Sequence, residues 1–136
     1  MATFTLELVS PEQLLFSDEV EMAEIPAAEG YIGVLPGHAP MIVALRGGVI
    51  RIHKGSAVTH RLFVAGGFAE ITPERCTVLA EEAVPVADLS PESATVRVAE
   101  AEAAYAEAAK GESVEAREAA MARLLAARAR LEAAAG

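Results

Sequence analysis

Three histidines and a single cysteine are the side chains of this sequence that could carry acid–base, nucleophilic or metal chemistry. His38 stands between Pro36 and Pro40, where its imidazole could act as a base or ligand, or could hydrogen-bond the loop backbone and fix the turn. A catalytic base also needs a partner acid or nucleophile, and the sequence supplies none at a suitable spacing. We therefore expect His38 to fix the loop, and we predict no catalytic residue.

The other candidates for metal or thiol chemistry are equally isolated. His53 and His60 flank the turn at Lys54-Gly55 and could face each other across a hairpin, but no third ligand has a suitable spacing. Cys76 lies among strand-forming residues, where a cysteine behaves as a small hydrophobic side chain. We expect neither a metal site nor a reactive thiol.

The glycine pairs at 47–48 and 66–67 do not form a phosphate-binding loop, because neither has the GxxxxGKS/T spacing or leads into a helix. We predict no cofactor. The formal net charge of -9 repels nucleic-acid phosphates and anionic lipid headgroups. Because the sequence opens without a basic leader and has no apolar stretch of about 20 residues, we expect a soluble protein that meets a membrane only through a partner.

Charged residues cluster in two places. Glu19, Glu21 and Glu24 alternate with apolar residues and are expected to be solvated along a strand edge. Residues 119–131 contain arginines but no acid, so these guanidinium groups either complement the helix dipole or meet an acidic partner surface. The arginines concerned are Arg123, Arg128 and Arg130.

The elements that must position these residues fall into two halves. Up to about Pro85 the chain alternates polar and apolar residues in short segments separated by turn signals such as Pro36-Gly37 and Thr72-Pro73. This pattern predicts an antiparallel β-sandwich or flattened barrel. Several segments are apolar on both faces, which indicates that some strands are covered on both sides.

The composition of the second half favours helices, because residues 94–136 contain 18 alanines and no proline. Ser90 is a suitable N-cap for a helix from about Pro91 to Lys110, and Ser113 can cap a second one. We therefore predict a β-sandwich domain over residues 1–85 and an αα-hairpin over 86–136. The hairpin buries mainly alanine methyl groups and a few larger side chains, and so is expected to undock easily. Its larger apolar residues are Val96, Val98, Tyr105, Met121, Leu124, Leu125 and Leu131.

One long run connects the sequence to a known family. Glu29 to Pro40 reads EGYIGVLPGHAP, residues 45–51 follow with LRGGVIR, and further matching runs are LVSPE at 8–12, VAGGFAEI at 64–71 and VLAEEA at 78–83. These runs and the alanine-rich hairpin resemble the epsilon subunit of F-type ATP synthases over essentially the whole chain. The resemblance implies about ten strands in a sandwich followed by two helices.

The resemblance also implies a function. Such subunits are non-catalytic rotor components at the foot of the central stalk, which couple rotation of the c-ring to ATP synthesis and can inhibit ATP hydrolysis. Their partners are the gamma subunit, the c-ring and the alpha/beta catalytic head, at the cytoplasmic face of the bacterial inner membrane. The resemblance assigns docking on the c-ring and gamma to Glu29, Gly30, Tyr31, Ile32, Gly33, Pro36 and His38.

The hairpin of the family can extend toward an acidic segment of the beta subunits, and the resemblance assigns that contact to Arg123, Arg128 and Arg130. Members that bind ATP carry an Ile/Leu-Asp-x-x-Arg-Ala motif at the start of the first helix. Here Ser90 and Ser93 replace the acid and the arginine. The sequence therefore predicts weak ATP binding at most.

Two other interpretations stay open at this level. A stand-alone enzyme would use His38 or Cys76 and would need the partner residue that the sequence does not supply. A general β-sandwich adaptor would bind an unrelated acidic protein through its helices.

Overall fold

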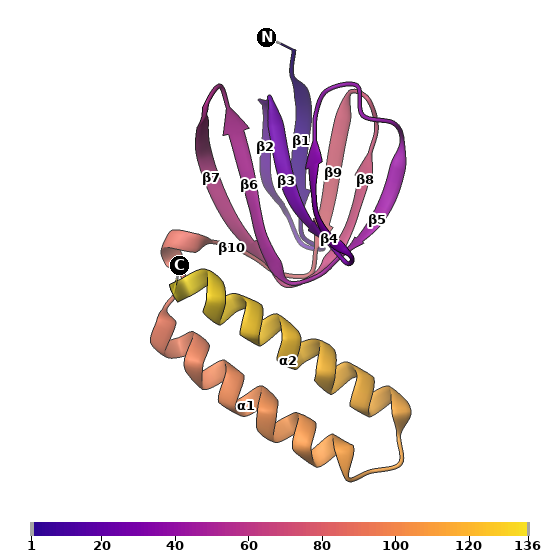
Figure 1. The fold of residues 1–136 in the computed structure, drawn as a ribbon, viewed down its shortest axis with the longest axis vertical. Coiled ribbons are helices and arrows are strands. Elements are labelled where there is room, and N and C mark those ends of the chain that lie inside the picture. The colour runs from indigo at the N-terminus through magenta and orange to yellow at the C-terminus, as the bar shows by residue number, and fades with distance from the viewer. Residues whose placement is uncertain (1, 136) are drawn as a thin grey trace.

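Residues 2–135 form a ten-stranded sheet and a pair of long helices in the computed structural model, with the helices side by side beneath one end of the sheet (Figure 1). The expected sandwich and helical hairpin are confirmed. The strands are β1 (Phe4–Val9), β2 (Leu14–Val20), β3 (Met22–Ala27), β4 (Gly30–Val34), β5 (Met41–Leu45), β6 (Gly48–Lys54), β7 (Ala57–Val64), β8 (Gly67–Ile71), β9 (Arg75–Ala80) and β10 (Ala83–Pro85).

The sheet curves around a single core, in the order β10-β7-β6-β3-β5-β8-β9-β1-β2, with β4 paired to β3. Neighbouring strands are antiparallel except for β1 and β9, which run parallel. Alternation places Phe4, Leu6 and Leu8 inside and the residues between them toward solvent, as the sequence predicted. The largest fully buried side chains include Phe4, Phe63, Ile25, Ile50 and Ile71.

The core of the sandwich is complete before the helices begin, since its fully buried cluster runs from Phe4 to Ala80. The hairpin has a separate and much smaller cluster of Ala101, Leu124 and Ala127. Two of the larger residues expected inside it are not buried: Val96 is 56% exposed and Leu125 is 55% exposed. The expectation was wrong for these two, because the buried seam between the helices is formed by Ala101, Leu124 and Ala127.

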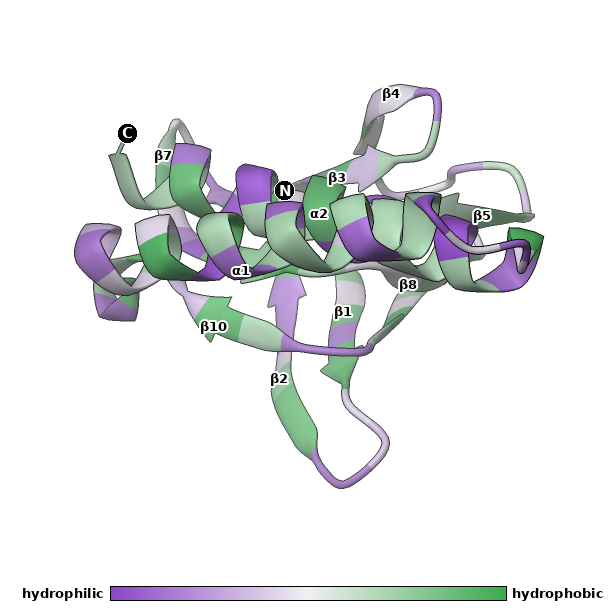
Figure 2. Ribbon diagram, turned by 90° about the horizontal axis from the view of Figure 1, so that it is seen from below, coloured by the Kyte–Doolittle hydropathy of each residue, from purple (hydrophilic) through white to green (hydrophobic). Residues whose placement is uncertain are grey.

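The two helices of the hairpin begin where their capping residues predict. A short 3₁₀ turn, η1 (Val86–Asp88), leads to α1 (Pro91–Ala109), and Ser90 caps α1 by accepting a hydrogen bond from the Ser93 amide at 3.2 Å. Ser113 accepts one from the Ala116 amide at 3.1 Å at the start of α2 (Val114–Ala135). Seen from below, α1 and α2 lie across the end of the sheet, and the β3–β4 turn projects beyond the side of α2 (Figure 2).

None of the helices in residues 2–135 is long and apolar enough to cross a membrane.

Candidate functional site

The residues assigned to docking lie at two opposite ends of β4. Glu29 and Gly30 form the turn after β3, beside α2, whereas Pro36 and His38 follow the other end of the strand. The Gly37 amide donates to the Pro73 carbonyl at 2.8 Å and so fastens this second loop to the turn between β8 and β9. The extended strand β4 separates the two segments.

Tyr31 ties β4 to β6 while its ring remains 43% exposed. Its hydroxyl oxygen accepts a hydrogen bond from the Val49 amide at 2.9 Å. Gly48 makes this approach possible, because a Cβ there would lie 2.8 Å from that oxygen and 2.7 Å from Pro26 Cβ. The guanidinium carbons of Arg46 and Arg51 lie 5.4 and 5.8 Å from the ring centroid, within cation–π range.

Some of the remaining docking candidates hold the structure in place, and others are exposed at the surface. Ile32 packs against the sandwich core, so its role in the structure is to hold β4 in place. Glu29 and Gly33 are exposed. His38 fixes its loop as expected, since its Nδ1 donates to the Ala39 carbonyl oxygen at 2.7 Å.

The other histidines do not face each other. A register shift between Ile52 and His53 places His60 opposite Ile52 instead. His53 Nε2 donates to the Glu24 carboxylate at 2.6 Å, and His60 packs edge-on against Phe16. Within residues 2–135 no group of histidines, cysteines and carboxylates could hold a metal ion.

Cys76 is fully buried, and burial raises the pKa of its thiol to about 12. It is a core side chain, as predicted. The acidic residues near β2 are more engaged than the sequence indicated: Glu19 accepts a hydrogen bond from the Thr3 hydroxyl at 3.2 Å, and Glu21 accepts one from the Gly55 amide. Lys54 pairs with Asp18 and, with the Glu19 amide, lowers the pKa of that carboxyl group.

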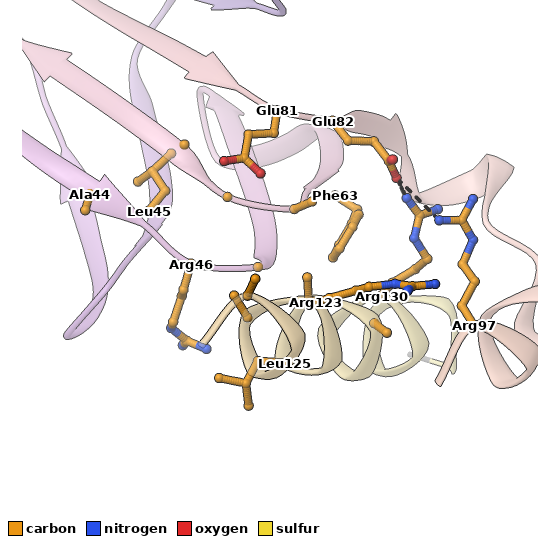
Figure 3. Close-up of a pocket in the computed structure, with 18 of the residues that line it drawn as sticks. Ala44, Leu45, Arg46, Phe63, Glu81, Glu82, Arg97, Arg123, Leu125 and Arg130 are labelled. Atoms are coloured by element: carbon orange, nitrogen blue, oxygen red, sulfur yellow. Dashed lines mark ion pairs between the residues drawn. The ribbon is translucent and has the colours of Figure 1, made fainter. Parts of the chain in front are cut away.

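Arg130 is only 9% exposed and forms a clamp between α2 and the sandwich. Its guanidinium pairs with Glu82, which follows β9, and lies over the Phe63 ring with 5.0 Å from carbon to centroid. Arg97 of α1 reaches the same carboxylate at 3.9 Å, so both helices converge on it (Figure 3). Burial lowers the pKa of Arg130, but an arginine remains charged at neutral pH.

The other two arginines have different surroundings. Arg128 pairs with Glu102 across the hairpin at 3.7 Å, with both side chains about half exposed. Arg123 is exposed and lines a cavity of about 770 Å³ between α2 and the end of the sandwich. Arg130 lines the same cavity as Arg123, whereas Arg128 is not among its lining residues. Sequence spacing along a helix could not reveal this, because Glu82 and Phe63 come from the distant β half.

An exposed apolar row on the outer face of the sheet was not predicted as a site. The row consists of consecutive cross-strand partners on four neighbouring strands, namely Ala44 of β5, Phe68 of β8, Leu79 of β9 and Val9 of β1. Phe68 is 58% exposed, and Ile42, on the same face of β5, is 70% exposed. The signal was in the sequence: the strands around Ile42 and Phe68 are apolar on both faces, which indicates a covering partner.

Comparison with known proteins now decides the family. The family described as "ATP synthase, Delta/Epsilon chain, beta-sandwich domain" matches residues 3–86. An ATP synthase epsilon chain from Granulibacter bethesdensis is 60% identical over 134 residues, covering 98% of each chain. This chain belongs to the ATP synthase epsilon-chain family. The epsilon chain of Gluconacetobacter diazotrophicus is 50% identical, over 100% of this chain and 96% of that one.

Solved structures share the fold of this epsilon-family chain. A chain in the structure of Euglena gracilis mitochondrial ATP synthase, "OSCP/F1/c-ring in rotational state 1", superposes with a TM-score of 0.80 at 24% identity, covering 100% of this chain and 83% of that one. A chain of the Tetrahymena thermophila "central stalk/cring" structure gives 0.69 at 11% identity, covering 96% of each. At these sequence identities, the structural similarity shows only that the folds are alike.

Proposed function

We propose that this chain is a non-catalytic rotor subunit at the foot of the central stalk, coupling proton-driven rotation of the c-ring to ATP synthesis. The observation that carries the proposal is its 60% identity, along 98% of both chains, to an ATP synthase epsilon chain. The structural roles of His38, His53 and Cys76 are consistent with a subunit that transmits force rather than performing chemistry.

The gamma subunit is the partner proposed for the exposed apolar row. Ile42 follows shortly after the loop of Pro36 and His38 in the chain, and we assign this loop to the same contact. An apolar face of this kind loses unfavourable contact with water when a partner covers it. Several neighbouring strands contribute to it, which suits a rigid contact that must bear torque.

The c-ring is proposed to meet the turn after β3. The β3–β4 turn, which contains Glu29 and leads into β4 at Gly30, projects beyond the side of α2 (Figure 2). Tyr31 and Gly33 follow on β4 and are exposed. The polar and backbone groups of this turn suit the polar loops of the ring. Contact with the cytoplasmic face of a bacterial inner membrane would then be made through the ring.

Regulation is proposed to involve the hairpin. In the folded position Arg130 is used in the clamp to Glu82, while Arg123 and Arg128 stay accessible. An extended hairpin would bring all three toward an acidic surface of the beta subunits. The clamp therefore favours the folded, non-inhibiting position, and attraction to the head favours the extended one.

The test is reconstitution of ATP synthase depleted of its epsilon subunit. Adding this chain should restore proton-coupled ATP synthesis, and Phe68→Asp should abolish the restoration because a carboxylate would be buried against gamma. Val114→Asp is the control, since Val114 is exposed at the start of α2 and lies outside the row. A folded chain that neither joins the complex nor restores synthesis would overturn the proposal and favour an adaptor of another kind.

A further inference from the structure

A second cavity, of about 310 Å³, lies between the sandwich and the last turns of α2. Its lining contains three arginines, Arg46, Arg51 and Arg61, together with Tyr31. This is a local concentration of positive charge in a chain whose net charge is -9. Its lining includes neither Arg130 nor the apolar row proposed to contact gamma, but it does include Tyr31, which is proposed to contact the c-ring.

Within the described residues, the three guanidinium groups lack the acidic partners that such groups usually find. None of the ion pairs formed by residues 2–135 involves them. Arg51 and Arg61 are direct cross-strand partners on β6 and β7, an arrangement in which like charges repel. Glu24 is the partner of Arg51 on the other side, but its carboxylate contacts His53.

Tyr31 adds a donor to the same cavity. Its hydroxyl oxygen already accepts the Val49 amide, so the hydroxyl proton remains available to donate into the cavity. Planar guanidinium groups and a hydroxyl donor are the groups that bind phosphate-type oxyanions, with paired N–H donors on each arginine.

We propose that Arg46, Arg51 and Arg61, with the Tyr31 hydroxyl, form a binding site for a phosphate-type oxyanion. Such an anion would remove the repulsion between Arg51 and Arg61. The phosphate could be free or belong to a nucleotide. The cavity is at the small end of the roughly 300–1,000 Å³ typical of ligand pockets, which favours free inorganic phosphate.

The position of the hairpin should affect this site. Glu132 of α2 also lines the cavity, and its carboxylate would repel an anion held by the arginines. The site is therefore stronger when α2 is withdrawn. By reciprocity, a bound anion weakens the docking of α2, which makes phosphate a ligand that biases the hairpin.

The experiment titrates the isolated full chain with inorganic phosphate in a chloride buffer of constant ionic strength, by calorimetry. We expect saturable binding that weakens about tenfold or more in Arg51→Gln and in Arg61→Gln, because each removes a charge-assisted hydrogen bond. Glu132→Gln should tighten binding. Arg75→Gln is the matched control, because Arg75 is exposed and pairs with Glu7 elsewhere.

Thermal unfolding gives a second readout on the same proteins. Without phosphate, Arg61→Gln should unfold at a higher temperature than the wild type, because it removes the repulsion from Arg51. Phosphate should then stabilise the wild type and leave this variant unchanged. A parallel titration with ADP distinguishes the sources: tighter binding of ADP that depends on the same arginines assigns the site to a nucleotide phosphate.

Absence of saturable phosphate and ADP binding, or equal weakening by Arg75→Gln, would overturn the proposal. Because the measurement uses the isolated chain, that result would leave its role in the rotor untouched.

Discussion

At the level of single residues, Arg130 and Arg123 lie on the same helix but have different surroundings. Arg130 is buried against Phe63 and Glu82, whereas Arg123 is exposed, although both line the cavity between α2 and the sandwich. The cation–π contact of the desolvated guanidinium with the aromatic ring stabilises the docked helix by about 0.5–2 kcal/mol. The ion pair to a half-exposed carboxylate adds at most about 1 kcal/mol. Arg130 is therefore the main polar contact that docks α2.

Replacing Arg130 by Ala should weaken the folded position of the hairpin by about 1–2 kcal/mol, a five- to thirtyfold change in its population. Amide hydrogen exchange in α2 would report this as faster exchange, with the core strands unchanged. Arg123→Ala should leave exchange in α2 close to that of the wild type. If both variants accelerate it equally, the clamp does not determine docking.

At the level of elements, two adjacent glycines link the sandwich to different neighbours. A Cβ on Gly47 would lie 3.1 Å from Ala129 Cβ and 3.2 Å from Ala126 Cα, both on α2. A Cβ on Gly48 would instead meet Pro26 and Tyr31 within the sandwich. One position therefore controls the approach of the helix and the other the packing of β4 on β6.

Gly47→Ala should displace α2 at a cost of about 1 kcal/mol to docking, with little effect on the sandwich, because the docked helix can shift. Gly48→Ala should lower the free energy of unfolding of the sandwich by about 1–3 kcal/mol, since its neighbours are fixed. Hydrogen exchange of α2 and denaturant unfolding separate the two effects. The assignment fails if the two variants give the same pattern.

We also predict that residues 1–85 fold without the hairpin, because the main buried cluster ends at Ala80. Removing α2 uncovers Phe63, so the fragment should lose about 1.5–3 kcal/mol of stability. Circular dichroism and denaturant unfolding would measure this loss, and binding to gamma would test docking. A fragment that stays unfolded would show that the hairpin is part of the folding unit.

At the level of the whole molecule, the arginines of α2 act in opposite directions on the hairpin. Arg123 and Arg128 are available to an acidic surface, whereas Arg130 holds the folded position. A substitution of all three would combine these opposing effects. The expected inhibition must therefore be tested with the arginines separated.

In the assembled enzyme, the double variant Arg123→Ala and Arg128→Ala should raise ATP hydrolysis by about two- to fivefold, the effect of losing about 0.5–1 kcal/mol of attraction to the head. Added salt should reproduce part of this rise, since exposed ion pairs are screened. Arg130→Ala alone should lower hydrolysis, because it frees the hairpin to extend. Hydrolysis that is unchanged by the double variant at all ionic strengths would exclude an electrostatic brake.

The sequence by itself determined the elements and the family. Strand alternation, turn residues and capping serines at Ser90 and Ser113 act over a few residues, so local physical chemistry sets them. The same locality explains why the role of His38 was predictable: its partner, Ala39, is its neighbour in the chain. The burial of Cys76 likewise followed from the pattern of its own strand.

Only the tertiary structure decided which distant groups meet. The register shift at His53 separates two histidines that the turn seemed to place together, and a whole strand separates Glu29 from His38. The clamp joins Arg130 to Glu82, and Arg46, Arg51 and Arg61 share one cavity, through packing between elements far apart in sequence. Such contacts depend on the curvature of the sheet and the docking of α2, which no local pattern specifies.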